Sequence, residues 1–174
     1  MKVTAFAASS SKKSINKQLV IYAASLLKGA EIEVLDLNDY ELPLFSVDKE
    51  EELGVPSPAR NFLQKLQHTD AVVISFAEHN GSYTAAYKNL LDWLSRIERE
   101  IFQNKPAVFL ATSPGAKGGA GVLDTALASA RFFGADVRSS LSIPLFAENY
   151  DVVAQRICNE EYNERLVHVM NSIG

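Results

Sequence analysis

Cysteine, histidine and basic side chains are all scarce in this 174-residue sequence. Its single cysteine, Cys158, cannot form an internal disulfide, and its three histidines lack the paired spacing of a zinc site. We therefore expect a reducing, cytoplasmic location and no bound metal. The 17 lysines and arginines are outnumbered by 21 aspartates and glutamates, which gives a net charge of −4. Nucleic-acid binding normally requires a basic excess, so we expect no nucleic-acid partner.

Long apolar runs are also missing. No stretch approaches the ~20 residues that a membrane-spanning helix needs, so we expect no membrane partner. The short apolar run from Val3 to Ala8 is followed by serines and lysines too early for a signal peptide. A length of 174 residues is typical of one domain, and we expect residues 1–174 to form a single one.

Three familiar nucleotide and phosphate signatures are absent. The sequence contains neither G-x-G-x-x-G nor G-x-x-x-x-G-K-[ST], which argues against a dinucleotide-binding Rossmann domain and a P-loop protein. The first predicted strand ends in Ala7, Ala8 and Ser9, without the acidic pair that holds magnesium in a phospho-receiver domain.

Apolar runs alternate with segments of helical periodicity along the chain, which predicts a parallel sheet covered by helices. The runs at residues 71–76 and 107–111 are apolar on successive residues, as is typical of strands buried on both faces. The predicted strands are Val3–Ala8, Ile32–Leu35, Ala71–Phe76, Ala107–Ala111 and Val137–Ile143.

Helical spacing predicts a first helix from Ile15 to Leu27, with Ser14 as its N-cap and Gly29 as its stop. Later helices are expected around residues 90–97, 123–130 and 158–173. The last of these would make Cys158 a core residue. The long connection from Leu37 to Ser57 shows little periodicity, and we expect it to be functional or packed against a partner.

In an open parallel sheet, ligands bind beyond the carboxyl ends of the strands. The loop Ser9–Asn16 offers hydroxyls, lysines and a helix start, which suit a phosphate. The loop Ala77–Thr84 contains Asn80 and Gly81, which permit a tight turn, and Thr112–Gly121 holds four glycines. Each loop alone also fits an ordinary polar turn, but three at one sheet edge favour a binding site.

These loops carry recognisable motifs. Residues 8–16 fit G-S-x-R-x-x-S-x-N through Ala8, Ser9, Ser11, Ser14 and Asn16. Residues 77–82 and 88–93 fit P-E-Y-N-x-S and K-N-x-x-D-W at the right separation. The sequence thereby resembles the NAD(P)H-dependent FMN reductase family from residue 2 to about residue 141. It departs from the family pattern by having Ala8 for glycine, Ser11 for arginine, Ala77 for proline and His79 for an aromatic residue.

The resemblance implies an α/β fold of the flavodoxin-like kind, three layers with a five-stranded parallel sheet in the order 2-1-3-4-5. It implies an enzyme that passes hydride from NADPH or NADH through bound FMN to a flavin, a quinone or a similar small-molecule electron acceptor, with no catalytic side chain assigned. FMN is expected rather than FAD, because only one helix start is suited to phosphate. The implied cofactor-binding residues are Ser9, Ser11, Ser14, Ile15, Asn16, Glu78, His79, Asn80, Gly81, Ser82, Ser113, Pro114 and Gly115.

A homodimer or homotetramer is expected, because Leu37–Ser57 and Tyr83–Trp93 carry more apolar side chains than a single-domain surface needs, and family members commonly associate. Two other functions remain open. One is a non-enzymatic flavodoxin-like electron carrier. The other is a flavin-free scaffolding protein on the same fold, which the departures at Ser11 and His79 would suit.

Overall fold

The centre of the computed structural model, which describes residues 1–173, is a sheet of five parallel strands. The strand order is β2-β1-β3-β6-β7, which confirms the predicted order 2-1-3-4-5. One predicted strand has the observed bounds, and the other four begin one or two residues earlier than predicted. The five strands are β1 (Lys2–Ala8), β2 (Glu31–Leu35), β3 (Ala71–Phe76), β6 (Lys105–Thr112) and β7 (Ala135–Ile143).

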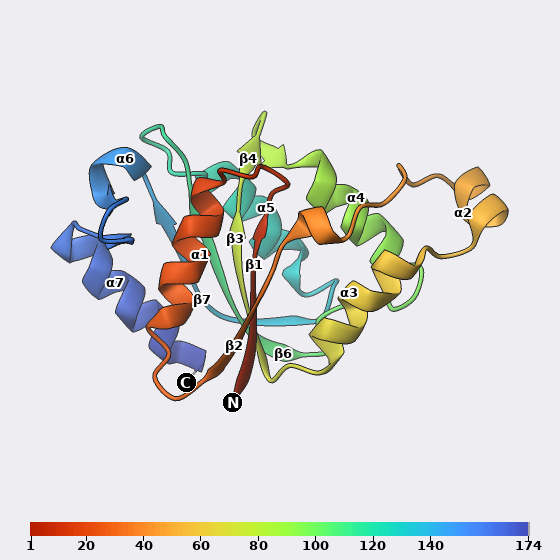
Figure 1. Ribbon diagram of the computed structural model, residues 1–174, viewed down its shortest axis with the longest axis horizontal. Helices are drawn as coiled ribbons and strands as arrows, with labels where there is room; N and C mark the ends of the chain where they lie inside the picture. Colours follow the sequence, from red (N-terminus) through yellow and green to blue (C-terminus); the bar gives the residue numbers. More distant parts are fainter. Residues whose placement is uncertain (174) are drawn as a thin grey trace.

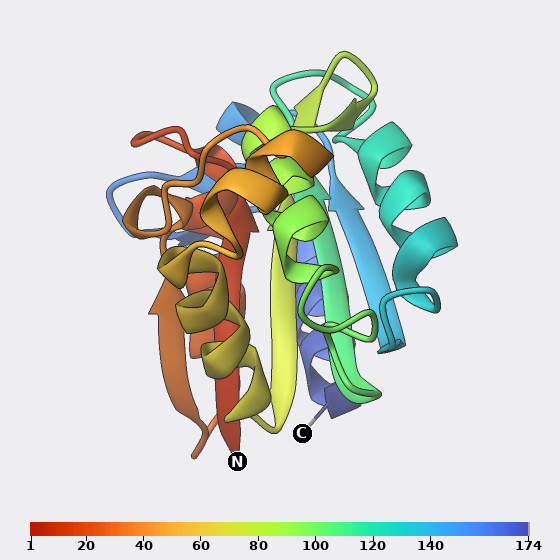
Figure 2. The same cartoon turned by 90° about the vertical axis from the view of Figure 1, so that its right-hand side faces the viewer.

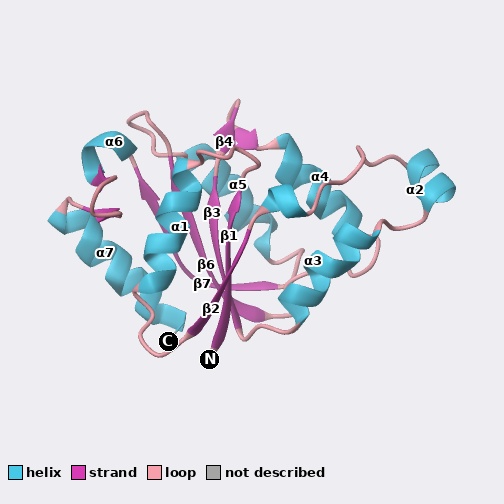
Figure 3. Ribbon diagram, in the orientation of Figure 1, coloured by secondary structure: helices cyan, strands magenta, loops and turns pink. Residues whose placement is uncertain are grey.

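Helices cover both faces of the sheet and complete a three-layer α/β/α arrangement (Figures 1 and 3). One face carries α1 (Ile15–Ser25) and α7 (Glu160–Met170). The other carries α3 (Ser57–Gln67), α4 (Ala85–Leu94) and α5 (Ala120–Ala130). In Figure 2, α3 and α4 stand in front of the sheet and α5 lies at its right. An apolar core fills each interface, because successive strand residues point to opposite faces. None of the described helices is both long and apolar enough to span a bilayer.

Short elements complete the fold. They are η1 (Leu37–Asp39), α2 (Val47–Leu53), β4 (Glu78–His79), β5 (Ser82–Tyr83), α6 (Phe146–Asn149), β8 (Tyr150–Asp151), β9 (Arg156–Ile157) and η2 (Asn171–Ile173). Strands β4 and β5 form a small antiparallel hairpin, which lies at the top of the molecule in Figure 1.

The helix caps account for where α1 and α7 begin. Ser14 is the N-cap of α1 as predicted, and its Oγ accepts a hydrogen bond from Lys17 N at 3.3 Å. Helix α7 starts only after its own cap, Asn159, whose Oδ1 accepts from Tyr162 N at 3.2 Å. The predicted core position of Cys158 is therefore wrong, since this residue precedes the helix and is exposed.

The Leu37–Ser57 connection is held against α4 by three side chains. Asn89 Oδ1 accepts from Phe45 N at 2.8 Å, and Trp93 Nε1 donates to Pro43 O at 2.8 Å. Arg96 Nε donates to the Glu50 carboxylate at 2.9 Å. Asn89, Trp93 and Arg96 are spaced four and three residues apart, so they lie on one side of α4, with Arg96 just past its last residue. Asn89 and Trp93 of the K-N-x-x-D-W motif thus hold this connection in place.

The exposed apolar surface that we predicted for residues Tyr83–Trp93 is largely absent, because most of its apolar side chains are buried. Tyr87, Leu90, Leu91 and Trp93 are all buried within their own chain, so the expected excess of exposed apolar side chains in this segment is wrong. The alternating exposure of an amphipathic helix explains this result, because α4 turns these residues toward the sheet. By contrast, α2 buries none of its residues and projects away from the sheet in Figure 1.

Candidate functional site

The loops that follow β1, β3 and β6 meet at one edge of the sheet and enclose a cleft of about 280 Å³. This edge includes the point between β1 and β3 where the strand order reverses, which is where open α/β sheets bind ligands. The cleft is lined by Ser9, Ser11, Lys13, Ser14, Ile15, Asn16, Ala77, Glu78, His79, Thr112, Ser113 and Pro114.

Most of the residues predicted to bind a cofactor lie at this cleft, but four do not. Asn80, Gly81, Ser82 and Gly115 are absent from its lining. Asn80 and Gly81 form the hairpin turn beyond His79, and Ser82 begins β5 on the returning strand. Three lining residues were not among the predicted contacts: Lys13, Ala77 and Thr112. Ala77 and Thr112 could have been found from their positions at or just after a strand end.

The start of α1 is suited to an anion. The first N–H groups of a helix have no partner within the helix, and this end carries a partial positive charge. The cap is a neutral serine, and the first turn holds no acidic side chain. Lys13 adds a cation to the lining of the cleft. A phosphate placed here would meet these N–H groups, the serine hydroxyls and Lys13.

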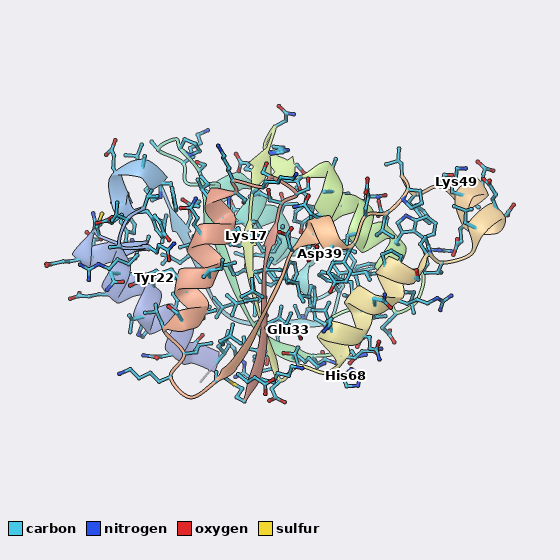
Figure 4. All side chains as sticks on the ribbon, in the orientation of Figure 1. Lys17, Tyr22, Glu33, Asp39, Lys49 and His68 are labelled. Carbon is cyan, nitrogen blue, oxygen red and sulfur yellow. The ribbon has the colours of Figure 1, made fainter. Side chains whose placement is uncertain are left out.

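Lys17 also lies near the start of α1, but its positive charge is neutralised by Asp36. Its Nζ forms an ion pair with Asp36 at the end of β2, and Figure 4 shows Lys17 on α1. Burial raises the pKa of Asp36, but the hydrogen bonds from Lys17 and Asn38 outweigh it and leave the pKa lowered. Lys13 therefore remains the cation that lines the cleft.

The Asn16 side chain faces the protein interior. Its Nδ2 donates to Thr112 O at 3.0 Å, and its Oδ1 accepts from Thr112 N at 3.1 Å and from Ser75 Oγ at 2.7 Å. Three of the four hydrogen bonds that this amide can make are thus formed inside the protein. The side chain joins α1 to β3 and β6, and its backbone N–H remains the group available to a phosphate.

The second loop makes the tight turn that its sequence predicts. Asn80 and Gly81 have φ values of 53° and 76°, and both positive angles are typical of a two-residue hairpin turn. Glu78 lines the cleft from this hairpin, and its Oε2 accepts a hydrogen bond from Val122 N at 2.8 Å. His79 is exposed beside it.

The third loop is held by the end of β7 and the chain that follows it. Phe146 N donates to Ser113 O at 3.1 Å, and Leu145 N donates to Gly115 O at 3.1 Å. Ser142 Oγ donates to Gly118 O at 2.9 Å. These bonds fix the loop despite its glycine content, so Ser113 and Pro114 line the cleft from an ordered backbone.

A second cavity, of about 380 Å³, lies between η1 and α4 and reaches Ser10 in the first loop. Its lining includes Asn38 and Asn89, whose side chains already hydrogen-bond within the protein. The loop cleft offers the better binding site, because a helix N-terminus and several hydroxyls converge there. Among the described residues, no group of three or more histidine, cysteine, aspartate or glutamate side chains is arranged to hold a metal ion.

Comparison with known proteins gives consistent matches. A family model described as NADPH-dependent FMN reductase matches residues 1–147. An NADPH:quinone oxidoreductase of Arabidopsis thaliana is 33% identical over 123 residues, which cover 68% of this chain and 61% of that protein. A quinone reductase of Escherichia coli (strain K12) is 34% identical over 80 residues, covering 46% of this chain and 43% of that protein. The matched segments thus span less than two thirds of these two relatives.

A solved structure resembles this chain along nearly its whole length. The flavoenzyme FerB of Paracoccus denitrificans, an NAD(P)H:(acceptor) oxidoreductase, superposes with a TM-score of 0.78 at 25% sequence identity. The superposition covers 99% of this chain and 94% of that one. The flavodoxin-like arrangement described above is therefore shared with a flavoenzyme.

Proposed function

The chain belongs to the NADPH-dependent FMN reductase family, and from this membership we propose that it is an FMN-dependent NAD(P)H oxidoreductase. Its electron acceptor is a flavin, a quinone or a similar small molecule. The observation that carries the proposal is the cleft itself, where the first and second loops, which carry the family's motifs, meet the glycine-rich third loop beside the start of α1. Relatives named as quinone reductases support the choice of acceptor class.

The residues at the cleft fit FMN. Its phosphate matches the start of α1, where backbone N–H groups, serine hydroxyls and Lys13 offer donors and positive charge. A flat ring fits between the second and third loops, beside His79 and Pro114. One such helix start suits one phosphate group, which favours FMN over FAD.

The chain's own part in the reaction is to bind and to orient. When bound, FMN supplies the capacity to take a hydride from a reduced nicotinamide and to pass the reducing equivalents on. The start of α1 would hold the phosphate, and the third loop, which is hydrogen-bonded to β7 and the chain after it, would limit how far the ring can shift. His79 offers a planar imidazole at the place where family members usually have another aromatic ring. No side chain is assigned a proton-transfer step.

Further proposals concern the whole protein. We propose that residues 1–174 form one domain, that the protein works in the cytoplasm, and that it binds no nucleic acid. We also propose that it assembles as a homodimer or homotetramer. The exposed apolar side chains of α2 and the preceding loop support this assembly, since isolated protomers rarely expose several large apolar groups together.

The proposed function is tested by identifying the flavin and then measuring turnover. Heat release and chromatography of the purified or reconstituted protein should yield FMN, and the protein should oxidise NADPH or NADH with a quinone or FMN as acceptor. Finding FAD would contradict the cofactor. A flavin-bound protein without NAD(P)H turnover would favour the electron carrier. No flavin after reconstitution with excess FMN would favour the scaffolding protein.

A further inference from the structure

Glu78 contacts a helix that begins far from it in sequence. Its Oε2 lies 2.8 Å from Val122 N, in the first turn of α5. The N-cap of α5 is Gly119, which has no side chain and makes no capping hydrogen bond. The first N–H groups of a helix need outside partners, and a carboxylate is favoured there. Glu78 therefore supplies the cap that the sequence around Gly119 lacks.

Gly121 makes room for this contact. A Cβ built on Gly121 would lie 3.0 Å from Glu78 Oε2 and 3.7 Å from Gly81 O. A residue with a side chain would thus crowd the carboxylate, whereas its contact with the hairpin turn would be an ordinary van der Waals contact. Gly121 lies in the first turn of α5, and within a helix glycine costs up to roughly 1 kcal/mol relative to alanine. The close approach of the hairpin gives this otherwise unfavourable glycine a physical reason.

A second bond joins the same hairpin to the same helix. Tyr83 OH lies 2.9 Å from Ser129 Oγ, close to the other end of α5. The hairpin is therefore attached to α5 at both of its strands, through Glu78 on β4 and Tyr83 on β5. Of these two side chains, only Glu78 lines the cleft.

We propose that Glu78 is a positioning residue that joins the second and third loops by capping α5, and that its carboxylate does not bind the cofactor. The cap fixes the separation of the two loops between which the flat ring would lie. Its loss would leave the Tyr83–Ser129 hydrogen bond to hold the β5 side of the hairpin, and the β4 side would become fully ordered only when ligand binds. The part of this proposal that concerns flavin rests on the proposed function, whereas the structural link between the loops does not.

Two variants of Glu78 test the proposal in the flavin-free protein. Glu78→Ala removes the acceptor, and Glu78→Gln keeps an oxygen that can accept from Val122 N. Hydrogen–deuterium exchange should rise about tenfold in Glu78→Ala, both in the first turn of α5 and in residues 78–83. Glu78→Gln should stay close to the wild type. Unchanged exchange in Glu78→Ala, or equal exchange in both variants, would overturn the proposal.

Flavin affinity provides a second measurement. Glu78→Ala should weaken FMN binding about tenfold, because binding must then order the hairpin, while Glu78→Gln should recover most of the affinity. The matched control is Asn159→Ala, which removes a cap from α7 outside the cleft and should leave FMN affinity unchanged. Affinity that falls equally in Glu78→Ala and Asn159→Ala would overturn a positioning role. If the wild type binds no FMN, the proposed function fails, and the exchange measurement alone decides the link between the loops.

Discussion

Asn16 shows how much one side chain can contribute at the edge of a sheet. It is only 2% exposed, and it hydrogen-bonds to both backbone groups of Thr112 and to Ser75. The family motif pairs it with Ser14, whose hydroxyl caps α1. The two residues are only two positions apart in sequence, yet the Asn16 side chain bonds to the sheet and the Ser14 side chain caps the helix.

Replacing each residue alone should separate these roles. Asn16→Ala leaves the Thr112 backbone groups without partners and should lower the free energy of unfolding by about 2 to 4 kcal/mol. Ser14→Ala should lower it by only about 1 kcal/mol, the usual cost of losing a cap. Ser14→Ala should nevertheless weaken FMN binding, since a hydroxyl at the phosphate site is lost. Urea unfolding of the flavin-free protein and FMN titration measure the two effects. Equal unfolding midpoints for Asn16→Ala and wild type would contradict the structural role of the amide.

Glu33 should make the free energy of unfolding depend on pH in the acid range. The hydrogen bond from Lys65, helped by the charge of Lys2, holds the pKa of Glu33 below its usual 4.5, against the effect of burial. Figure 4 marks this residue on β2. The pKa of Glu33 is lower in the folded than in the unfolded protein. The ion pair therefore stabilises the fold at pH values above the unfolded-state pKa, and this stabilisation is lost as the pH falls through the folded-state pKa.

Glu33→Gln should therefore be less stable than wild type at neutral pH and equally stable in strong acid. The carboxylate is partly exposed, so the difference at neutral pH should stay below about 1 kcal/mol. Urea unfolding across the acid range measures it. A difference that persists at full size in strong acid would show that the ion pair is not its source.

At the scale of elements, the third loop depends on glycine at one position above all. Gly118 has a φ of 60°, and a Cβ there would meet Ser142 Oγ at 2.6 Å and Ile143 C at 2.8 Å. Gly29 has a φ of 77° but nothing within 4 Å. The two positions thus share a left-handed backbone that would strain a residue with a side chain, and only Gly118 adds a steric conflict.

Gly118→Ala and Gly29→Ala form a matched pair. Gly29→Ala should cost about 1 kcal/mol of stability, the strain of a left-handed backbone alone. Gly118→Ala should cost at least about 2 kcal/mol and should also weaken FMN binding, because the loop must move away from β7. Thermal unfolding and FMN titration compare them. Similar effects of both substitutions would mean that the packing of the loop against β7 contributes little.

At the scale of the whole molecule, exposed large apolar side chains occur at several places, and three of them belong to α2 and the loop before it. Leu44 is 80% exposed, and Val47 and Leu53 nearby are also exposed. Trp93, which also motivated an assembly, is fully buried in its own chain. The apolar side chains that would support a homo-oligomer therefore belong to the projecting α2 and the loop before it.

Light scattering should return at least twice the 19.1 kDa mass of one chain. Leu44→Glu should shift the protein toward the monomer, because a charge would be buried at the interface. Val153→Glu is the control, since Val153 is 96% exposed on the turn between β8 and β9 and should leave the mass unchanged. A wild-type mass near that of a single chain would contradict the assembly.

The sequence by itself determined the features that local patterns control. Apolar runs on successive residues identified the buried strands, and Ser14 and Asn80–Gly81 identified a helix start and a tight turn. Loop positions after three strands then led to most of the residues that line the cleft. These features depend on residues a few positions apart, so their signals are readable along the chain.

Only the tertiary structure decided which partner each side chain meets. Asn16 bonds to a residue 96 positions away, Glu78 to one 44 positions away, and Trp93 to one 50 positions away. Sequence spacing carries no information on such pairs, because packing of the sheet and helices brings them together. Cys158 is a different case, because the error there was local: Asn159 caps α7, so the helix begins at Glu160 and leaves Cys158 outside it. The direction of each side chain at the cleft was therefore fixed by long-range packing and not by the local pattern.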